Sequence, residues 1–546
     1  MLSLIVNCLV YLMRGPTPTC RCASAGERGG RQTGIVNGRE AVEVLHRSTS
    51  HGEPVAHPER LLAFRPLDPS NRPDPFKTYR GVEARRLPRE LRRSSLPASD
   101  VLSGRRAESG PGTLDDDLLG TLLFLAAGVT RMTHTIDGEP IWFRPAMSAG
   151  NLHPVEIYVV GDGQVQHYEP LDHGLTPLRS GVDVGEGVTL VLAGIPFRTC
   201  WKYGERGWRH LWWDAGTMLA NLLAVAEAHG VPAQVEAGFV DAAVAALVGI
   251  DGVDEMPLAL VRLGDGELRL PPPDELEPVA VQALPVAPRV LRFPLVVEAQ
   301  AATALADPDA VAEWRRAAQA VPAPAPTELE PPASADPDDR TEDVILRRGS
   351  TRLFRPETAA GPLLTWALPA ACRAVPIDAA AAGSLIEHLV NVHDVAGMEP
   401  GRHRYLAAGG WQEHTASDAA REIGAHLCLD QPLGGDSAYT VFHAAVLDRV
   451  FGRLGGRGYR AAHLEAGIVA GRLSLASVAL GNGATGLTFY DGRVSRLFDT
   501  DATPLLATAV GIPATSPAPS GTPGAPTELG GYGRIMTRLS RSLRRR

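Results

Sequence analysis

The stretch RPAMSAGNLHPVE, residues 144–156, places Ser, Gly, Asn, His and Pro together directly before the apolar run IYVV. A packed β-strand needs none of these polar side chains. A loop that holds a flat polar ligand against a sheet edge can use all of them, because hydroxyl and amide groups bond the ligand and glycine allows close approach. The pattern predicts a ligand-binding loop carrying Ser148, Gly150 and Asn151, followed by a strand.

A second candidate lies in DVILRRGSTRLFRPE, where Arg347, Arg348, Ser350 and Arg352 stand close together. Guanidinium groups match phosphate oxygens in a two-pronged geometry, and a serine hydroxyl adds a further donor. This composition predicts a phosphate cradle, although a solvated basic turn would look similar. The first half of the chain offers only LSGRRAESG, with Arg105 and Arg106 and neither the serine nor the third arginine.

A glycine-rich turn follows in ALGNGATGLTFYDG, which contains Gly481, Gly483, Thr485 and Gly486. Glycines let the backbone approach a planar ring and donate its N–H groups. Such turns are common, so the turn gains weight only beside the other motifs.

The stretch FRTCWKYGERG places Lys202 and Tyr203 before a glycine. A neighbouring cation lowers the pKa of a phenol, so this pair can act as an acid or a base. A Lys-Tyr pair on a surface turn is common without any function.

Two long stretches of the chain share one plan, YGERGWRHLWWDAG followed by a helical pattern, and LGGRGYRAAHLEAG followed by another. In the first, apolar residues at helical spacing predict an amphipathic helix that ends at Gly230. The match of RGWR to RGYR and of DAG to EAG indicates a diverged tandem duplication. Residues 368–379, LPAACRAVPIDA, are the expected degenerate counterpart of the 144–156 loop.

Composition narrows the class of protein. The chain has 546 residues, 44% of them hydrophobic, and a net charge of -9, which does not favour nucleic acid as the main partner. Its six cysteines are scattered and give no metal-binding or redox spacing. The apolar start before Arg14 is shorter than the ~17–25 residues that span a bilayer. We expect a cytoplasmic protein with no metal site.

The organisation that we predict has five parts. They are an N-terminal extension (1–40), a first domain (41–265), a linker rich in Pro, Ala and acidic residues (266–340), a second domain (341–512) and a flexible basic tail (513–546). Within the linker, AVAEWRRAAQAV is expected to form a short helix.

Together these motifs resemble the flavin-dependent nitroreductase superfamily, and within it the SagB-type azoline dehydrogenases of ribosomal-peptide biosynthesis. The stretches that carry the resemblance are SNRPDPFKTYRG, SAGNLHPVEIYVV, WKYGERGWR, RRGSTRLF, MEPGRHRY and ALGNGATG. The resemblance covers roughly 40–265 and 341–512. It implies an α+β fold of two tandem nitroreductase-like domains, packed as an intrachain pseudo-dimer.

The resemblance also implies FMN as cofactor. The arginine-rich turn and glycine-rich loop of the second half, with Ser148, Gly150 and Asn151 from the first, would form one competent FMN site, and the mirror-image site would have decayed. Lys202 and Tyr203 match the pair that removes a proton while FMN accepts hydride, which converts an azoline ring to an azole. The implied partners are a modified precursor peptide and other biosynthetic enzymes.

Two other functions fit the same sequence. One is an NAD(P)H-dependent nitro- or quinone-reductase, which uses FMN without a proton-removing pair. The other is a non-catalytic scaffold in a peptide-modifying complex, which the degenerate motifs and the long linker permit. The electron acceptor, the ring type and the oligomeric state stay open.

Overall fold

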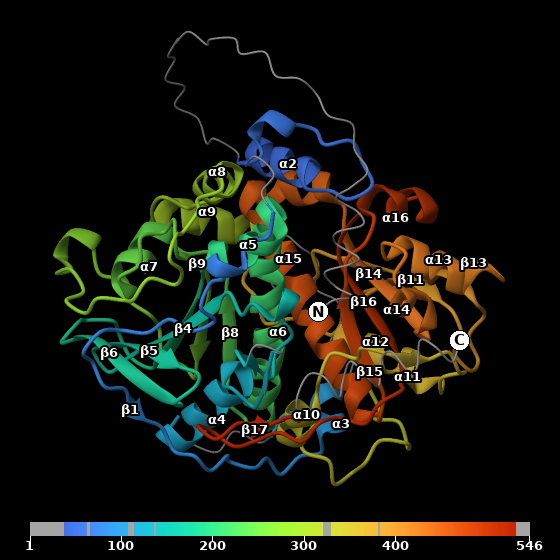
Figure 1. The fold of residues 1–546 in the computed structure, drawn as a ribbon, viewed down its shortest axis with the longest axis horizontal. Coiled ribbons are helices and arrows are strands. Elements are labelled where there is room, and N and C mark those ends of the chain that lie inside the picture. The colour runs from blue at the N-terminus through green and yellow to red at the C-terminus, as the bar shows by residue number, and fades with distance from the viewer. Residues whose placement is uncertain are drawn as a thin grey trace. The chain divides into compact units, whose positions relative to one another are not determined.

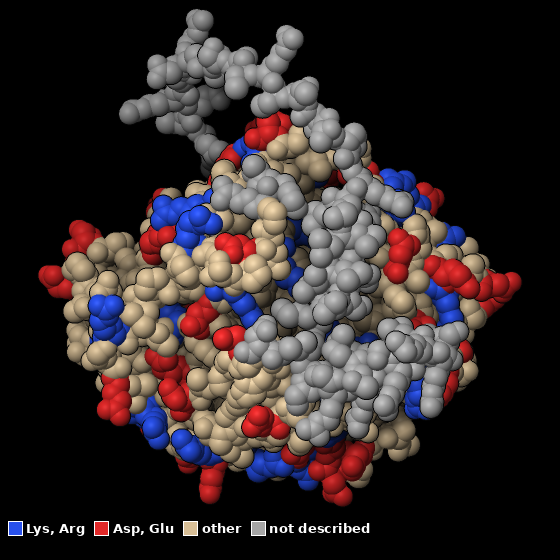
Figure 2. Space-filling model, viewed as in Figure 1, with Lys and Arg blue, Asp and Glu red and all other residues tan. Residues whose placement is uncertain are grey.

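The structure is a computed structural model that describes residues 38–62, 66–107, 114–135, 138–319, 329–380 and 383–530, all within one compact unit. Nearly all of the predicted N-terminal extension and the last residues of the predicted tail lie outside these ranges. On the face drawn in Figure 2, acidic and basic side chains are interspersed. Among the described residues, no helix is long and apolar enough to cross a membrane.

The first of two large sheets is antiparallel throughout. Its strands in spatial order are β1 (Arg85–Arg86), β6 (Gly174–Ser180), β5 (Gln164–Glu169), β4 (Val155–Gly161), β7 (Val188–Gly194), β9 (Met256–Leu263) and β8 (Ala233–Glu236). The strand predicted after the 144–156 loop is β4, and it is buried on both faces. Val155 and Ile157 face the main core, while Tyr158 and Val160 face a smaller one. This explains why β4 is apolar at successive positions.

The second sheet repeats the plan of the first. Its strands are β10 (Phe354–Arg355), β16 (Thr503–Pro513), β14 (Tyr439–Ala445), β11 (Glu387–Val392), β12 (Gly401–Leu406) and β13 (Gly410–Ala416), with β15 (Gly483–Leu487) also paired to β16. The order β5-β4-β7-β9-β8 of the first sheet recurs as β12-β11-β14-β16-β15.

A third, small sheet joins the C-terminal end of the described chain to a hairpin of the first half. It consists of β17 (Thr527–Glu528), β2 (Arg131–His134) and β3 (Pro140–Phe143). β17 runs parallel to β2, and the N–H groups of Gly521 and Thr527 both donate to the Thr130 carbonyl. The prediction of a flexible tail from residue 513 is therefore wrong for 513–530, because this segment pairs with a hairpin of the first half.

Helices surround and separate the sheets (Figure 1). They are α2 (Arg39–Ser48), α3 (Ala98–Ser103), α4 (Asp116–Ala127), α5 (Pro196–Tyr203), α6 (Gly207–Ala228), α7 (Asp241–Val248), α8 (Pro294–Ala302), α9 (Pro308–Gln319), α10 (Thr341–Arg347), α11 (Pro362–Thr365), α12 (Ala367–Ala371), α13 (Ala420–Leu427), α14 (Pro432–Asp436), α15 (Leu447–Ala479) and α16 (Asp491–Phe498).

Helices α6 and α15 pack against each other in the middle of the molecule (Figure 1). They meet at the glycines of the repeated DAG and EAG motifs. A Cβ added to Gly216 would lie 2.6 Å from the Cα of Gly467, so neither position has room for a side chain. All 22 residues of α6 are buried. The predicted amphipathic helix is thus buried on every side, because α15, α4, α5 and the 144–151 loop cover it between them.

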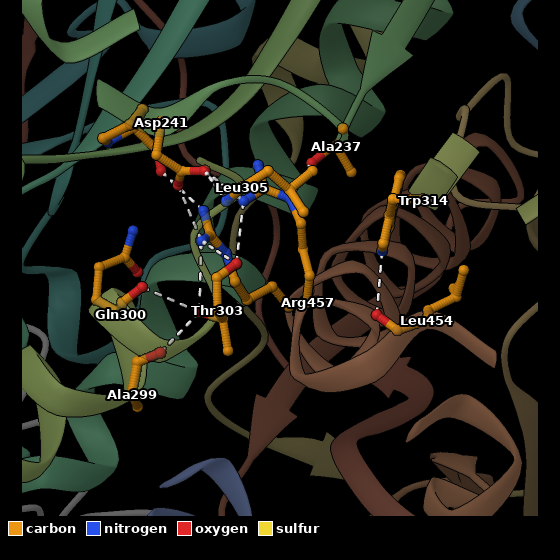
Figure 3. A network of polar contacts seen from close by, with 12 residues as sticks. Ala237, Asp241, Ala299, Gln300, Thr303, Leu305, Trp314, Leu454 and Arg457 are labelled. Carbon is orange, nitrogen blue, oxygen red and sulfur yellow. Dashed lines mark hydrogen bonds and ion pairs between the residues drawn. The ribbon is translucent and has the colours of Figure 1, made fainter. Parts of the chain in front are cut away.

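The arginines of the repeated motifs form reciprocal ion pairs between the halves. Arg209 lies 2.8 Å from Asp491 at the start of α16, and Arg206 reaches the same carboxylate. Arg457 lies 2.5 Å and Arg460 3.0 Å from Asp241 at the start of α7 (Figure 3). These buried pairs explain why both copies keep the two arginines: each pair fixes its half to the other.

The predicted linker contains packed structure of its own. The expected short helix is confirmed as α9, and Trp314 on it is buried and donates to the Leu454 carbonyl (Figure 3). Leu295 and Val296 on α8 are also buried in the main core. The segment therefore contributes to the core through Leu295, Val296 and Trp314, whereas Leu284 is exposed.

Candidate active site

The 144–151 loop is a tight turn between β3 and β4. Gly150, Asn151 and His153 all have left-handed backbone conformations, with φ of 67°, 59° and 48°. Ser148 stabilises the turn because its hydroxyl accepts from the His153 N–H at 2.9 Å. Asn151 donates from its side chain to the Trp142 carbonyl at 2.7 Å. Two non-glycine residues in this conformation mark a turn that its surroundings hold in place.

Helix α6 supplies an acidic anchor for the same turn. The Asp214 carboxylate accepts from the Ser148 hydroxyl at 2.6 Å and from the Ala149 N–H at 3.1 Å. Burial raises the pKa of Asp214 to about 7, against the opposing effect of these two hydrogen bonds. One turn further along α6, the Thr217 hydroxyl donates to the Met147 carbonyl at 2.7 Å.

Lys202 and Tyr203 are the last two residues of α5, which ends at Gly204 with φ of 57° and ψ of -149°. A Cβ added to Gly150 would lie 2.8 Å from the Tyr203 hydroxyl and 3.3 Å from the Lys202 Nζ. The structure thus brings the predicted loop and the predicted Lys-Tyr pair together, and the close approach with φ of 67° favours glycine at position 150.

Aromatic side chains of α6 extend from Tyr203 toward the second half. The ring of His210 makes an edge contact with Tyr203 at 4.4 Å between centroids, and it stacks on Trp213 at 4.6 Å. Trp213 donates to Nδ1 of His463 on α15 at 2.7 Å. Trp212 and Trp213 are both buried between the halves, which favours an interface role over substrate binding for both.

Arg348 is the centre of a buried cluster of positive charge. Its Nε donates to the Pro145 carbonyl at 2.6 Å, so it joins the second half to the 144–151 loop. Its Nη1 is buried and has no hydrogen-bond acceptor among the described residues. Burial, together with Arg131 and Arg352, lowers the pKa of Arg348 to about 9. A buried guanidinium with repelling neighbours and an unused donor is costly unless an anion binds there.

Arg131, the first residue of β2, was not predicted from the sequence. Its guanidinium donates to the carbonyls of Leu346, Arg348 and Pro519, which ties the arginine turn to the C-terminal segment. The available signal was a lone arginine at the start of a strand, which carries too little information to stand out.

The glycine-rich turn lies against the arginine turn. The Thr351 N–H donates to the Ala484 carbonyl at 3.0 Å, and a Cβ on Gly483 would collide with the Thr351 side chain. Thr485 is buried in β15, and Gly481 precedes this strand with φ of 72°. The predicted pieces of the second half therefore form one surface, which Arg348 connects to the first-half loop.

Four further predicted residues have different surroundings. Arg347 binds Asp339 with both of its terminal nitrogens and reaches the Val478 carbonyl, so its charge is already neutralised. Ser350 lies half-buried in the turn, and Arg352 is exposed beside Arg348. Gly486, in β15, is exposed to solvent.

The counterpart of the 144–151 loop in the second half is not 368–379 as predicted. Residues 367–371 form α12, and Asp378 caps the N–H groups of Ala237 and Gly238. The contact that Ser148 makes in the first half is made here by Ser384, which donates to Glu465 at 2.6 Å. The sequence concealed this because only two residues separate Ser384 from β11, so the loop has lost its ligand-binding portion.

Comparison with known proteins agrees with this fold. Residues 111–265 match the model of the nitroreductase family, so the chain carries a nitroreductase-family domain. A crystal structure of a candidate nitroreductase from Anabaena variabilis matches with a TM-score of 0.65 and 23% identity, over 87% of this chain and 99% of that chain. At this identity the likeness shows the fold alone, and that nitroreductase-like fold extends across both sheets.

Two relatives are similar in sequence. One is the candidate nitroreductase MJ1384 of Methanocaldococcus jannaschii, 29% identical over 32% of this chain and 90% of that protein. The other is the microcin B17-processing protein McbC of Escherichia coli, 29% identical over 22% of this chain and 54% of that protein. The matched region thus spans about half of McbC.

Proposed function

We propose that this protein is an FMN-dependent dehydrogenase that oxidises azoline rings to azoles in a ribosomally made peptide. The observation that carries the proposal is the contact of Gly150 with Lys202 and Tyr203, on a loop that Arg348 joins to a buried positive cluster. The similarity to a protein named for processing microcin B17 supports a peptide substrate and partner enzymes of the same kind.

The residues present fit FMN. The unused Nη1 of Arg348 and the adjoining Arg131 would hold its phosphate, while Arg347, already paired with Asp339, is not needed for it. Ser148, Gly150 and Asn151 on one side, and Gly483, Thr485 and Gly486 on the other, would border its ring. Bound there, FMN would supply the acceptor for a hydride.

The chain's own residues would position the substrate and move one proton. Azoline oxidation removes a proton and a hydride from adjacent ring atoms. The Tyr203 oxygen would take the proton as the general base, and Lys202, whose Nζ lies 5.2 Å from the Tyr203 ring centroid, would stabilise the phenolate form. His210, packed edge-on against Tyr203, would limit rotation of the phenol.

The repeated strand order, the reciprocal ion pairs and the α6–α15 contact support two tandem nitroreductase-like domains that face each other within one chain. In this arrangement the first half supplies the loop, the Lys-Tyr pair and Arg131, and the second half supplies Arg348 and the glycine-rich turn. We propose a single FMN site per chain, since Asp100 and Glu227 pair with Arg105 and Arg106, the arginines of the other edge.

Flavin stoichiometry tests the cofactor. We expect about one FMN per chain in the purified or reconstituted protein. Arg348→Ala should lose it, and Arg105→Ala, the matched control from the other half, should keep it. Two FMN per chain would contradict the single site, and no binding even with added FMN would favour the scaffold.

Turnover tests the reaction. An azoline-containing peptide should lose two hydrogens by mass spectrometry, and Tyr203→Phe should abolish this while FMN stays bound. The second candidate, an NAD(P)H-dependent nitro- or quinone-reductase, is favoured by the similarity to candidate nitroreductases. NADPH oxidation with menadione at equal rates in wild type and Tyr203→Phe, without peptide oxidation, would establish it instead.

A further inference from the structure

The turn that carries Gly150 is bound at Ser148 and Ala149 by one side chain of α6, in addition to the Thr217 and Arg348 contacts at Met147 and Pro145. Asp214 accepts from the Ser148 hydroxyl and the Ala149 N–H, and Ser148 in turn accepts from the His153 N–H. Gly150 is the next residue and lies against Lys202 and Tyr203. Asp214 is buried and accepts hydrogen bonds from the turn, so its carboxylate can affect the reaction through the loop.

We propose that Asp214 is a positioning residue whose carboxylate holds the Ser148–Gly150 turn against the Lys202–Tyr203 pair. The proposal rests on the proposed function for its catalytic meaning. The hydrogen-bond geometry on which it stands is independent of the substrate.

The surroundings of Asp214 explain how its protonation would affect the turn. A cavity of about 10 Å³, roughly the space of one water molecule, is bordered by Asp214, Ser148, Arg144, His153, Met147 and Met218. Arg144 and His153 are the ionisable neighbours on the loop side. His210 lies one turn away on α6, and His463 lies on the facing helix α15.

Of these neighbours, the histidines stay neutral near pH 7. Burial lowers the pKa of His153, His210 and His463 well below the usual value, and Arg144 stays charged. Asp214, with its pKa raised to about 7, is the group that changes state there. Above pH 7 the carboxylate accepts both hydrogen bonds, and below it the protonated acid accepts them more weakly.

The second half contains the same arrangement of a buried acid, a serine hydroxyl and a backbone N–H, but without a Lys-Tyr pair. Glu465 on α15 accepts from the Ser384 hydroxyl at 2.6 Å and from the Leu385 N–H at 2.9 Å, and burial raises its pKa to about 7 as well. The residues in the place of Lys202 and Tyr203 are Arg453 and Leu454. Glu465 is therefore a matched internal control.

Hydrogen–deuterium exchange of the FMN-loaded full chain tests the positioning directly. In Asp214→Ala we expect the peptide spanning residues 147–152 to exchange at least tenfold faster at pH 8. Glu465→Ala should leave that peptide unchanged and release the one around residues 384–386. In wild type, protection of 147–152, corrected for intrinsic rates, should fall below pH 7, and Asp214→Asn should remove this pH dependence.

Turnover gives the second readout. Asp214→Ala should lower kcat for the azoline peptide about tenfold with little change in KM, because orientation and not binding is lost. Asp214→Asn should lose the decline of kcat below pH 7. Unchanged exchange at 147–152 in Asp214→Ala, or equal release in Glu465→Ala, would overturn the positioning role. Failure of wild type to oxidise azolines would instead refute the proposed function and leave the exchange result standing.

Discussion

The two halves of this protein differ most clearly at their arginine turns. In the second half, Arg348 is buried beside Arg131 with an unused Nη1. In the first half, Arg105 is exposed and lies 3.2 Å from Asp100, and Arg106 lies 3.7 Å from Glu227. Both turns are basic in sequence. Acidic side chains pair with both first-half arginines, but in the described second half they pair with Arg347 and not with Arg348.

This difference teaches that an arginine pair in a sequence does not identify an anion site. What matters is whether the fold supplies a carboxylate, as Asp339 does for Arg347, or leaves the guanidinium buried without one, as it does for Arg348. The acidic residues responsible lie elsewhere in the chain, so the distinction depends on packing.

The largest effect that we expect concerns the buried Arg–Asp ion pairs, which both halves contain. Asp491→Ala leaves Arg206 and Arg209 buried without a counter-charge, and should lower the free energy of unfolding by about 3–5 kcal/mol. Asp241→Ala should do the same through Arg457 and Arg460. Denaturant unfolding measures both. Asp116→Ala, at an exposed pair with Arg85, is the control and should cost less than about 1 kcal/mol.

A marked inequality between the Asp491 and Asp241 variants would show that the halves are not held by equivalent contacts. The lowered pKa of both carboxyls also fixes the direction in which stability changes with pH. Their stabilisation is present above the ordinary aspartate pKa and is lost as pH falls through the lowered value.

The next effect is a contribution to stability that decreases as pH rises, the opposite of the dependence expected for Asp491 and Asp241. Asp214 and Glu465 have a pKa of about 7 in the folded protein, above their ordinary values. Global folding therefore favours their protonated forms, and this contribution to the free energy of unfolding is lost as pH rises through 7. The hydrogen bonds from the Ser148 turn favour the carboxylate of Asp214 instead, so local opening of that turn has the opposite pH dependence. Asp214→Asn and Glu465→Gln should each raise stability at pH 8, on the order of 1–3 kcal/mol, and give no gain at pH 4. Thermal melts across this range would contradict the assignment if the gain did not depend on pH.

Substitutions of glycines on α6 and α15 should have a smaller effect on the free energy of unfolding. A Cβ on Gly216 would lie 2.5 Å from the Leu464 carbonyl oxygen, so Gly216→Ala should destabilise by about 1–3 kcal/mol through overpacking. Gly452 on α15 has nothing within 4 Å of an added Cβ, so Gly452→Ala should stabilise by about 0.5–1 kcal/mol. Equal melting temperatures for the two variants would mean that α6 and α15 separate more easily than their packing indicates.

The smallest effect that we expect concerns the exposed arginine turn of the first half. Arg105→Ala breaks exposed ion pairs with Asp100 and Glu330 and should change the free energy of unfolding by less than about 1 kcal/mol. Raising the salt concentration should reduce even that difference. A loss above 2 kcal/mol would mean that Arg105 contributes more to the free energy of unfolding than its exposure indicates.

The sequence by itself determined the motifs and much of the fold class. The duplicated plan, the strand after the 144–156 loop, α9 and the nitroreductase resemblance all follow from local patterns, because glycine placement, periodicity and short motifs are local properties. The same patterns identified Ser148, Gly150, Lys202 and Tyr203, which the structure places together.

Only the tertiary structure decided what each of these residues contacts. It showed α6 buried on every side, strand β17 paired with β2, and Ser384 in the role that residues 368–379 were expected to hold. It also separated Arg348 from Arg347 and brought Arg131 and Asp214 to the site. The physical reason is that charge compensation and close packing depend on groups far apart in the chain, and a sequence lists those groups without their distances.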